Sequence, residues 1–331
     1  MVQSITVQWS LGPTIMDGTL VTPDGTGPFP AVVMAAGSGP TNRDWPSPLL
    51  PGTNGSAPLI AAELAQAGFA SLRYDKRVTG PHALENLRVL MGSLSMQSHA
   101  EEYAGAVNFL AAMSDIRGDQ IFGLGNSEGT LHVLHYQLGN PAVPLVGIIL
   151  AAPPGRPVGE VARSQLAAQV AAQATTVPNG AGLLALYDAA AERFEAGEAA
   201  NPDPALPDEV KNLIAALESP ANLPFSRELW KANAVPLLAE MTVPVLIVIG
   251  KKDIQVDWQA DGAPLLMASR GQPHITMVFP QNANHVLKYE PQDRSELVPG
   301  EVMLRYNADG VPLDPETMAT IRDWLSHCVV S

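Results

Sequence analysis

The ten residues 121–130, IFGLGNSEGT, decide which fold this chain adopts. A short apolar run leads into GNSEG at residues 125–129, and a helix-compatible stretch follows at residues 131–138. A strand, a tight turn and a helix in this order hold the turn residue on a strained backbone, from which its side chain projects. Glycines two positions before and two after Ser127 leave room for the helix to approach the strand. The segment therefore predicts Ser127 at the tip of the turn, with Oγ in a cleft.

Apolar runs and helical stretches alternate on both sides of this segment. Residues 31–36, AVVMAA, and residues 243–249 are continuous apolar runs, typical of strands that helices cover on both faces. Residues 5–22 alternate around turn signals and predict a leading antiparallel hairpin. Strands that alternate with helices predict a mostly parallel sheet, in which catalytic groups gather at the carboxyl ends of the strands.

A helical block interrupts this alternation. Residues 154–240 are rich in Ala and lack strand patterns, which divides the chain into a first core part at 1–153, a helical cap insertion at 154–240 and a second core part at 241–331. One helix face is expected from Val210, Leu213, Ile214 and Leu217. The cap side chains that we expect to face a substrate, or else to pack the cap on the core, are Leu183, Leu186, Tyr187, Phe194, Phe225 and Trp230.

Composition narrows the classes of partner. The 331 residues include 46% hydrophobic and 16% charged ones, and the formal charge is -14. An acidic protein gains no attraction from nucleic acid or from an anionic membrane, so neither is an expected partner. A single cysteine, Cys328, excludes an intrachain disulfide and a cysteine metal cluster. No apolar run approaches the ~20 residues of a membrane span, and the N-terminal residues lack a secretory pattern, so a cytoplasmic location is expected.

Ser127 needs a base and an acid to act as a nucleophile. A serine hydroxyl is poorly nucleophilic at neutral pH, so a histidine must accept its proton and a carboxylate must orient that histidine. His285 and Asp253 both follow expected strands, and the chain order Ser, Asp, His fits this chemistry. Asp257 and Asp261 compete for the acid position, but Asp253 lies closest to the end of its strand.

The negative charge on a substrate carbonyl oxygen needs preorganised donors. We expect the backbone N–H of Glu128, at the start of the helix, to be one donor. The N–H of Ser38, in the loop GSGPTNRD at residues 37–44, would be the other, with Gly39 close behind it. Arg43 and Asp44 are expected to pair and hold that loop rigid.

His132 and His135 form the other histidine pattern of interest. They stand three residues apart on the expected helix, a spacing that suits a metal ion. No third ligand lies near them in sequence, and no H-E-x-x-H signature is present. We expect packing or surface roles for both.

Taken together, these motifs resemble the α/β-hydrolases, and more narrowly the bacterial serine carboxylesterases. The resemblance rests on GSGP at residues 37–40, YDKR at 74–77, GNSEG at 125–129, GKKD at 250–253 and NH at 284–285. It implies an α/β-hydrolase fold with a mostly parallel eight-stranded sheet flanked by helices, no metal or other cofactor, and ester hydrolysis through an acyl-enzyme.

The substrate expected is a small-molecule ester with a small to medium acyl group. The same three residues would equally serve a thioesterase, a lactonase, an amidase or an acyltransferase, because these reactions share the acyl-enzyme step. From another class, a ligand-binding module with this fold and no activity is a further alternative. The sequence leaves homo-oligomer formation open.

Overall fold

A computed structural model of the chain describes residues 2–47, 50–173 and 179–330. A single sheet runs through the middle, with its strands in the order β1-β2-β4-β3-β5-β6-β7-β8. The strands are β1 (Gln3–Leu11), β2 (Thr14–Thr22), β3 (Phe29–Ala35), β4 (Ala70–Tyr74), β5 (Ile116–Asn126), β6 (Gly147–Ala151), β7 (Val245–Val248) and β8 (Ile275–Val278). The predicted eight-stranded sheet is confirmed.

Strand direction follows the sequence patterns. β2 pairs antiparallel with both β1 and β4, and the first of these pairs is the predicted hairpin, in register from Gln3 opposite Thr22 to Leu11 opposite Thr14. The other neighbours pair in parallel. Carboxyl ends of the parallel strands therefore meet at one edge, where the predicted catalytic residues follow β5, β7 and β8.

The sheet is buried on both faces, which explains the continuous apolar runs. In β3, Val33 belongs to one hydrophobic cluster, and its neighbours Val32 and Met34 belong to the cluster on the opposite face. All three side chains are fully buried. Full burial of a side chain of this size stabilises the fold by about 1.5–3 kcal/mol, so each such strand contributes on both faces.

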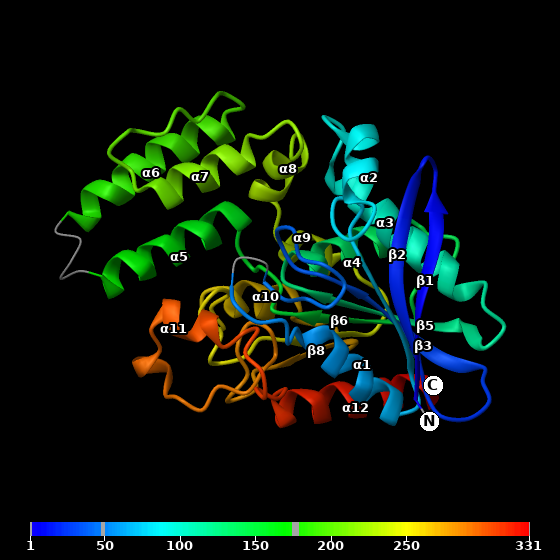
Figure 1. Ribbon diagram of the computed structural model, residues 1–331. Coiled ribbons are helices and arrows are strands. Elements are labelled where there is room, and N and C mark those ends of the chain that lie inside the picture. Colours follow the sequence, from blue (N-terminus) through cyan, green and yellow to red (C-terminus); the bar gives the residue numbers. More distant parts are fainter. Residues whose placement is uncertain (1, 48–49, 174–178, 331) are drawn as a thin grey trace.

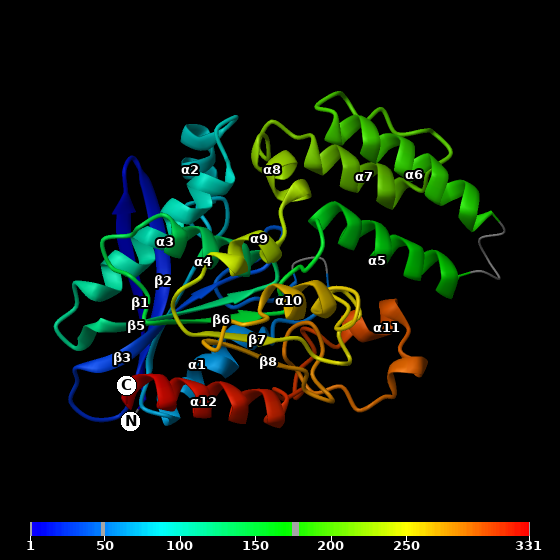
Figure 2. The same ribbon diagram turned by 180° about the vertical axis from the view of Figure 1, so that it is seen from behind.

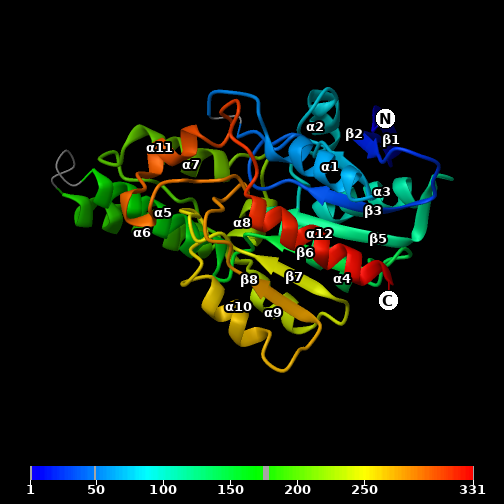
Figure 3. The same ribbon diagram turned by 90° about the horizontal axis from the view of Figure 1, so that it is seen from below.

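Helices form the outer layers, and Figures 1 and 3 show α1 and α12 on one face of the sheet and α3 and α4 on the other. The hydrophobic clusters agree with this division. The helices are α1 (Ser56–Gln66), α2 (Ala83–Leu90), α3 (Met96–Ala111), α4 (Glu128–Leu138), α5 (Val158–Ala172), α6 (Gly180–Glu195), α7 (Asp208–Leu217), α8 (Phe225–Lys231), α9 (Ala234–Ala239), α10 (Gly262–Ala268), α11 (Pro299–Leu304) and α12 (Pro315–Val330).

Helices α5 to α9 lie between β6 and β7 in sequence, in the stretch predicted to form a cap. In Figures 1 and 2, α5, α6 and α7 lie to one side of the sheet, away from the two chain ends. Tyr187, Phe194 and Ile214 form a hydrophobic cluster of their own there, whereas Ala234 and Leu238 of α9 pack in the core. The exact division at 154–240 stays a prediction.

Candidate active site

Ser127 occupies a strained turn between β5 and α4. Its backbone angles are φ 53° and ψ -120°, in a region that residues with a side chain rarely adopt. Such strain persists only where the surroundings impose it. Here the Ser127 N–H donates to the carbonyl of Ala151 in β6 at 2.8 Å, and Thr130 donates to the Ser127 carbonyl from its N–H and its hydroxyl. The turn therefore projects the Ser127 side chain beyond the carboxyl ends of the strands.

The two glycines around Ser127 allow α4 to approach the sheet closely. A Cβ on Gly125 would lie 2.5 Å from the carbonyl carbon of Gly129. A Cβ on Gly129 would overlap the carbonyl oxygen of Ala35 and lie 2.7 Å from that of Ala36. These neighbours are backbone atoms, which cannot rotate away. This is the close approach that the glycine spacing predicted.

His285 and Asp253 meet in a buried hydrogen bond. Nδ1 of His285 lies 2.9 Å from Oδ2 of Asp253, and the aspartate is fully buried. Oδ1 of Asp253 accepts hydrogen bonds from the N–H groups of Gln255 and Val256 at 2.8 and 2.9 Å. An ionised carboxylate only accepts hydrogen bonds, so the imidazole proton lies on Nδ1 and leaves Nε2 free to accept a proton.

The loops that carry this pair are held together by their backbones. A Cβ on Gly250, just after β7, would overlap the carbonyl of Ala283, two residues before His285. The N–H of Lys252 donates to that same carbonyl at 3.1 Å. The side chain of Asn126 donates to the His285 carbonyl at 3.1 Å and so connects the serine turn to the histidine loop.

The competing aspartates contact other partners. Asp257 pairs with Arg294 and accepts from the N–H groups of Gln259 and Ala260 at 2.9 and 2.7 Å. Asp261 is bound by Arg156, with Nη2 2.9 Å from Oδ2. Asp253 is therefore the predicted candidate that the structure brings to His285.

Ser127 and His285 line one pocket of about 350 Å³. Among the described residues, the Ser127 hydroxyl forms no hydrogen bond with the imidazole. Catalytic hydrogen bonds are often long without substrate and shorten in the complex, so this geometry is compatible with a serine and its base.

Two of the three predicted oxyanion donors also border this pocket. Ser38 and Glu128 line it beside Ser127, and Glu128 is the first residue of α4, where backbone N–H groups have no acceptor within the helix. Gly39 has φ 78° and is not among the lining residues. The two predicted donors that line the pocket therefore come from the loop after β3 and from the start of α4.

The pocket walls are mostly apolar. Of the six cap side chains expected to face a substrate, Trp230 lines the pocket, four pack inside the cap cluster, and Phe225 packs against the ring of His99. The sequence missed the other cap residues of the wall, although the helical spacing of Leu213 and Leu217 is visible in it. The wall contributed by α5, α7 and α8 consists of Val158, Val161, Ala162, Gln165, Leu213, Leu217, Ser226, Leu229 and Trp230.

The prediction that Arg43 pairs with Asp44 is wrong. Arg43 instead binds Asp75 through its N–H at 2.8 Å and through Nε and Nη2 at 3.0 and 2.6 Å. Asp44 accepts from Nε of Arg73 at 2.8 Å. Asp75 is nearly fully buried after β4, where a carboxylate without a cation would be costly, and the long Arg43 side chain reaches it. The loop is thus tied to β4.

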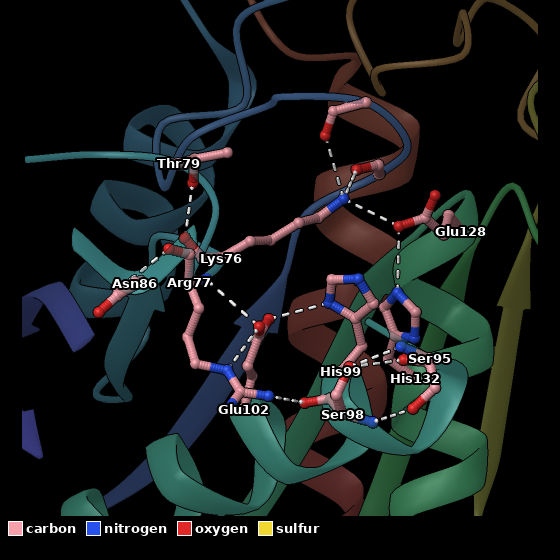
Figure 4. Close-up of polar contacts among 12 residues, drawn as sticks. Lys76, Arg77, Thr79, Asn86, Ser95, Ser98, His99, Glu102, Glu128 and His132 are labelled. Atoms are coloured by element: carbon pink, nitrogen blue, oxygen red, sulfur yellow. Dashed lines mark hydrogen bonds and ion pairs between the residues drawn. The ribbon is translucent and has the colours of Figure 1, made fainter. Parts of the chain in front are cut away.

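A buried polar network under this loop was not predicted. Lys76 binds Oε1 of Glu128 at 2.8 Å, and Nε2 of His132 lies 3.1 Å from the same oxygen (Figure 4). The ring of His132 stacks on that of His99 with centroids 4.8 Å apart, and His99 in turn contacts Glu102 at 2.9 Å. The sequence shows only that Lys76 lies two residues after the strand at Ala70–Tyr74.

Burial and charge set the ionisation of this network. Burial opposes the charged form of Glu128, but the charge of Lys76 and the hydrogen bond with His132 outweigh it and hold the pKa of the carboxyl well below its usual value. Burial lowers the pKa of His132 from 6.5 to about 4, against the opposing effect of Glu128. At neutral pH, His132 is therefore uncharged and donates from Nε2 to Glu128.

The low pKa of His132 predicts a loss of stability in mild acid. Between pH 6.5 and 4, His132 binds a proton in the unfolded chain but stays neutral in the folded protein. Its contribution to the free energy of unfolding is therefore complete above pH 6.5 and is lost as the pH falls through 4. We expect the free energy of urea unfolding to fall by a few kcal/mol in this window. His132→Gln keeps a donor for Glu128 but does not titrate, and it should flatten the decline. An unchanged decline in this variant would assign the acid sensitivity to other groups.

Neither a metal cluster nor a membrane-spanning helix is found among the described residues. His132 contacts Glu128, and residues 2–47, 50–173 and 179–330 contain no group of three His, Cys, Asp or Glu side chains suited to a metal ion. Within the same ranges, no helix combines the length and the apolar character needed to cross a bilayer.

Comparison with known proteins agrees with this fold. The chain is 27% identical over 274 residues to Esterase EstD from Thermotoga maritima, an alignment that covers 82% of this chain but only 58% of that protein. Proline iminopeptidase from Mycobacterium smegmatis superposes with a TM-score of 0.59 at 16% identity, covering 98% of this chain and 99% of the other. The Pyrococcus furiosus esterase PF2001 superposes with a TM-score of 0.56 at 12% identity, covering 98% of this chain and 91% of the other.

Residues 32–296 match the family model described as the alpha/beta hydrolase family. With four fifths of its length inside that match and the sheet and serine turn described above, this chain belongs to the alpha/beta hydrolase family.

Proposed function

We propose that this protein is a serine hydrolase that cleaves carboxylic esters of small to medium acyl groups through an acyl-enzyme intermediate. The observation that carries the proposal is the buried contact of 2.9 Å between His285 and Asp253, at the pocket that Ser127 also lines. In this mechanism Ser127 is the nucleophile, His285 the general base and Asp253 the residue that orients the imidazole.

The reaction would proceed in two steps. His285 Nε2 accepts the hydroxyl proton while Ser127 Oγ attacks the ester carbonyl carbon, and the negative oxygen is stabilised by the N–H groups of Ser38 and Glu128. The tetrahedral intermediate then releases the alcohol, which takes the proton from His285. Water attacks the acyl-enzyme by the same route, and the carboxylic acid leaves as Ser127 regains its proton.

The pocket supports the choice of substrate class. Its wall is built largely of aliphatic side chains and Trp230, which favour an uncharged hydrocarbon group. Its volume of about 350 Å³ suits a small to medium acyl group. The name of the relative from Thermotoga maritima, an esterase, points to the same reaction.

A matched substrate panel tests this function. We expect the butanoyl ester to be hydrolysed with a kcat/KM at least about tenfold above those of the butanoyl thioester, amide and lactone, a difference of about 1.4 kcal/mol in barrier. Esters from acetyl to dodecanoyl should show an optimum among the shorter acyl groups. The Ser127→Ala protein, assayed in parallel, gives the background. Fastest turnover of another class would identify a thioesterase, amidase or lactonase, and faster transfer to an added alcohol than to water would identify an acyltransferase. Binding without turnover of any substrate would favour the ligand-binding module.

A further inference from the structure

The ammonium of Lys76 joins the two elements that carry the oxyanion donors. Lys76 follows β4, and only 5% of its surface is exposed. An ammonium has three N–H donors, and Nζ lies 2.6 Å from the Gly37 carbonyl oxygen, 3.3 Å from that of Gly39 and 2.8 Å from Oε1 of Glu128. Figure 4 shows the extended Lys76 side chain reaching toward Glu128. Each donor therefore has an acceptor, on the loop after β3 or on the first residue of α4.

The hydrogen bond from Lys76 to the Gly37 carbonyl fixes the direction of the Ser38 N–H bond. The carbonyl of Gly37 and the N–H of Ser38 belong to one peptide unit, and in a trans peptide the two bonds point in opposite directions. Because Lys76 binds the carbonyl, the Ser38 N–H points away from the ammonium, and Ser38 itself lines the pocket beside Ser127. On the basis of the esterase mechanism above, we propose that Lys76 is a positioning residue that fixes the N–H groups of Ser38 and Glu128 for the oxyanion.

Charge adds to this geometric effect. A cation on the Gly37 carbonyl polarises the peptide, and linked hydrogen bonds of this kind strengthen one another by about 10–30% per bond. The N–H of Ser38 thereby becomes a stronger donor. The ammonium also balances the buried carboxylate of Glu128, which would otherwise oppose a second negative charge nearby.

A neighbouring ion pair provides a matched control. Arg77, the next residue, binds Oε1 of Glu102 in α3 at 2.9 Å, with 6% and 1% of the two side chains exposed. Lys76 and Glu128 are nearly as buried, at 6% and 2%. The Arg77 side chain donates to Glu102 and to the carbonyl of Ser98 rather than to the loop after β3. The two cations are thus alike in burial and pairing, but Lys76 contacts the loop and the helix residue that carry the proposed donors.

The experiment compares Lys76→Met with Arg77→Met. We expect Lys76→Met to lower kcat for the butanoyl ester by about 10- to 100-fold, somewhat less than the 10²–10³ lost with an entire oxyanion donor. KM should change by less than about threefold, because the interaction acts in the transition state. Affinity for an alkylboronic acid, which mimics that state on Ser127, should weaken by the same factor as kcat/KM. Arg77→Met should lower the midpoint of thermal unfolding at least as much but leave kcat within about threefold.

The outcomes separate the two proposals. Equal losses of kcat in both variants, in step with their thermal midpoints, would make Lys76 merely structural and overturn the inference. An active, phosphonate-labelled wild type with an equally active Lys76→Met would overturn the inference alone, whereas a wild type that neither turns over nor labels would overturn the esterase function itself.

If Lys76→Met does not fold, Lys76→Gln retains two amide donors without charge and should show an intermediate kcat. If neither folds, the Ser38 amide proton of the wild type should shift downfield in the boronate adduct, and an unshifted signal would contradict the role of Ser38.

Discussion

Replacing Ser127 by alanine should lower kcat by about 10⁴ or more while the protein remains folded, because removal of a nucleophile leaves only binding and oxyanion stabilisation. Alanine loses one oxygen atom and keeps the Cβ, so the turn at φ 53° faces no new steric demand. Steady-state hydrolysis of a butanoyl ester measures the loss. A fluorinated alkyl phosphonate followed by mass spectrometry should add one adduct to the wild type, at Ser127.

Ser226 offers a control within the same pocket. It lies on α8, and its hydroxyl donates to the carbonyl of Leu217, so it is engaged with the cap. Ser226→Ala should cost less than about tenfold in kcat, the range expected for a wall contact. An adduct on Ser226 or Ser38, or an active Ser127→Ala protein, would refute the assignment of the nucleophile.

Asp253→Asn should lower kcat by about 10³ to 10⁴, because the amide favours the wrong imidazole tautomer. Two N–H groups, of Gln255 and Val256, bind Oδ1 of Asp253 and would hold the amide oxygen of an asparagine in that place. The amide nitrogen would then face Nδ1 of His285 as a donor. The imidazole proton must move to Nε2, where it prevents acceptance of the serine proton.

The same change at Asp257 should cost less than about tenfold in kcat. Asp257 pairs with Arg294, whose Nη1 also donates to the carbonyls of Lys251 and Asp253 at 2.7 and 2.6 Å, so the loop keeps these supports without the carboxylate. Kinetics and thermal unfolding of both variants should therefore diverge, with a catalytic defect only at Asp253. A crippling Asp257→Asn with a mild Asp253→Asn would exchange their roles.

Local patterns carried most of what the sequence could predict. The serine turn could be predicted because ten consecutive residues specify it. The parallel sheet could be predicted because apolar runs such as 31–36 indicate strands that are buried on both faces, as they are in the structure. The preference for Asp253 used only its distance along the chain from β7. In the structure the reason is spatial, since Gly250 lets the two loops touch at Ala283.

Contacts between distant segments were beyond the sequence. Arg43 reaches Asp75 rather than its neighbour Asp44, and Lys76 reaches Glu128, 52 residues away. Charge patterns along a chain indicate nearby pairs, whereas these pairs exist because strand ends converge at one edge of the sheet. The pocket wall was misjudged for a related reason: large cap side chains such as Tyr187 and Phe194 serve the interior of the cap, and smaller ones on α7 face the pocket.

The position of α7 and α8 in the sequence affects how the substrate range of this protein can evolve. The residues proposed for bond cleavage follow β5, β7 and β8, whereas Leu213, Leu217 and Leu229 shape the wall from helices encoded between β6 and β7. Apolar exchanges on these helices alter the space for an acyl group and leave the hydrogen bond between His285 and Asp253 in place. Selection can thus act on the substrate range separately from the reaction chemistry. A library of variants confined to α7 and α8 can change the preferred acyl group while the proposed catalytic residues stay unchanged.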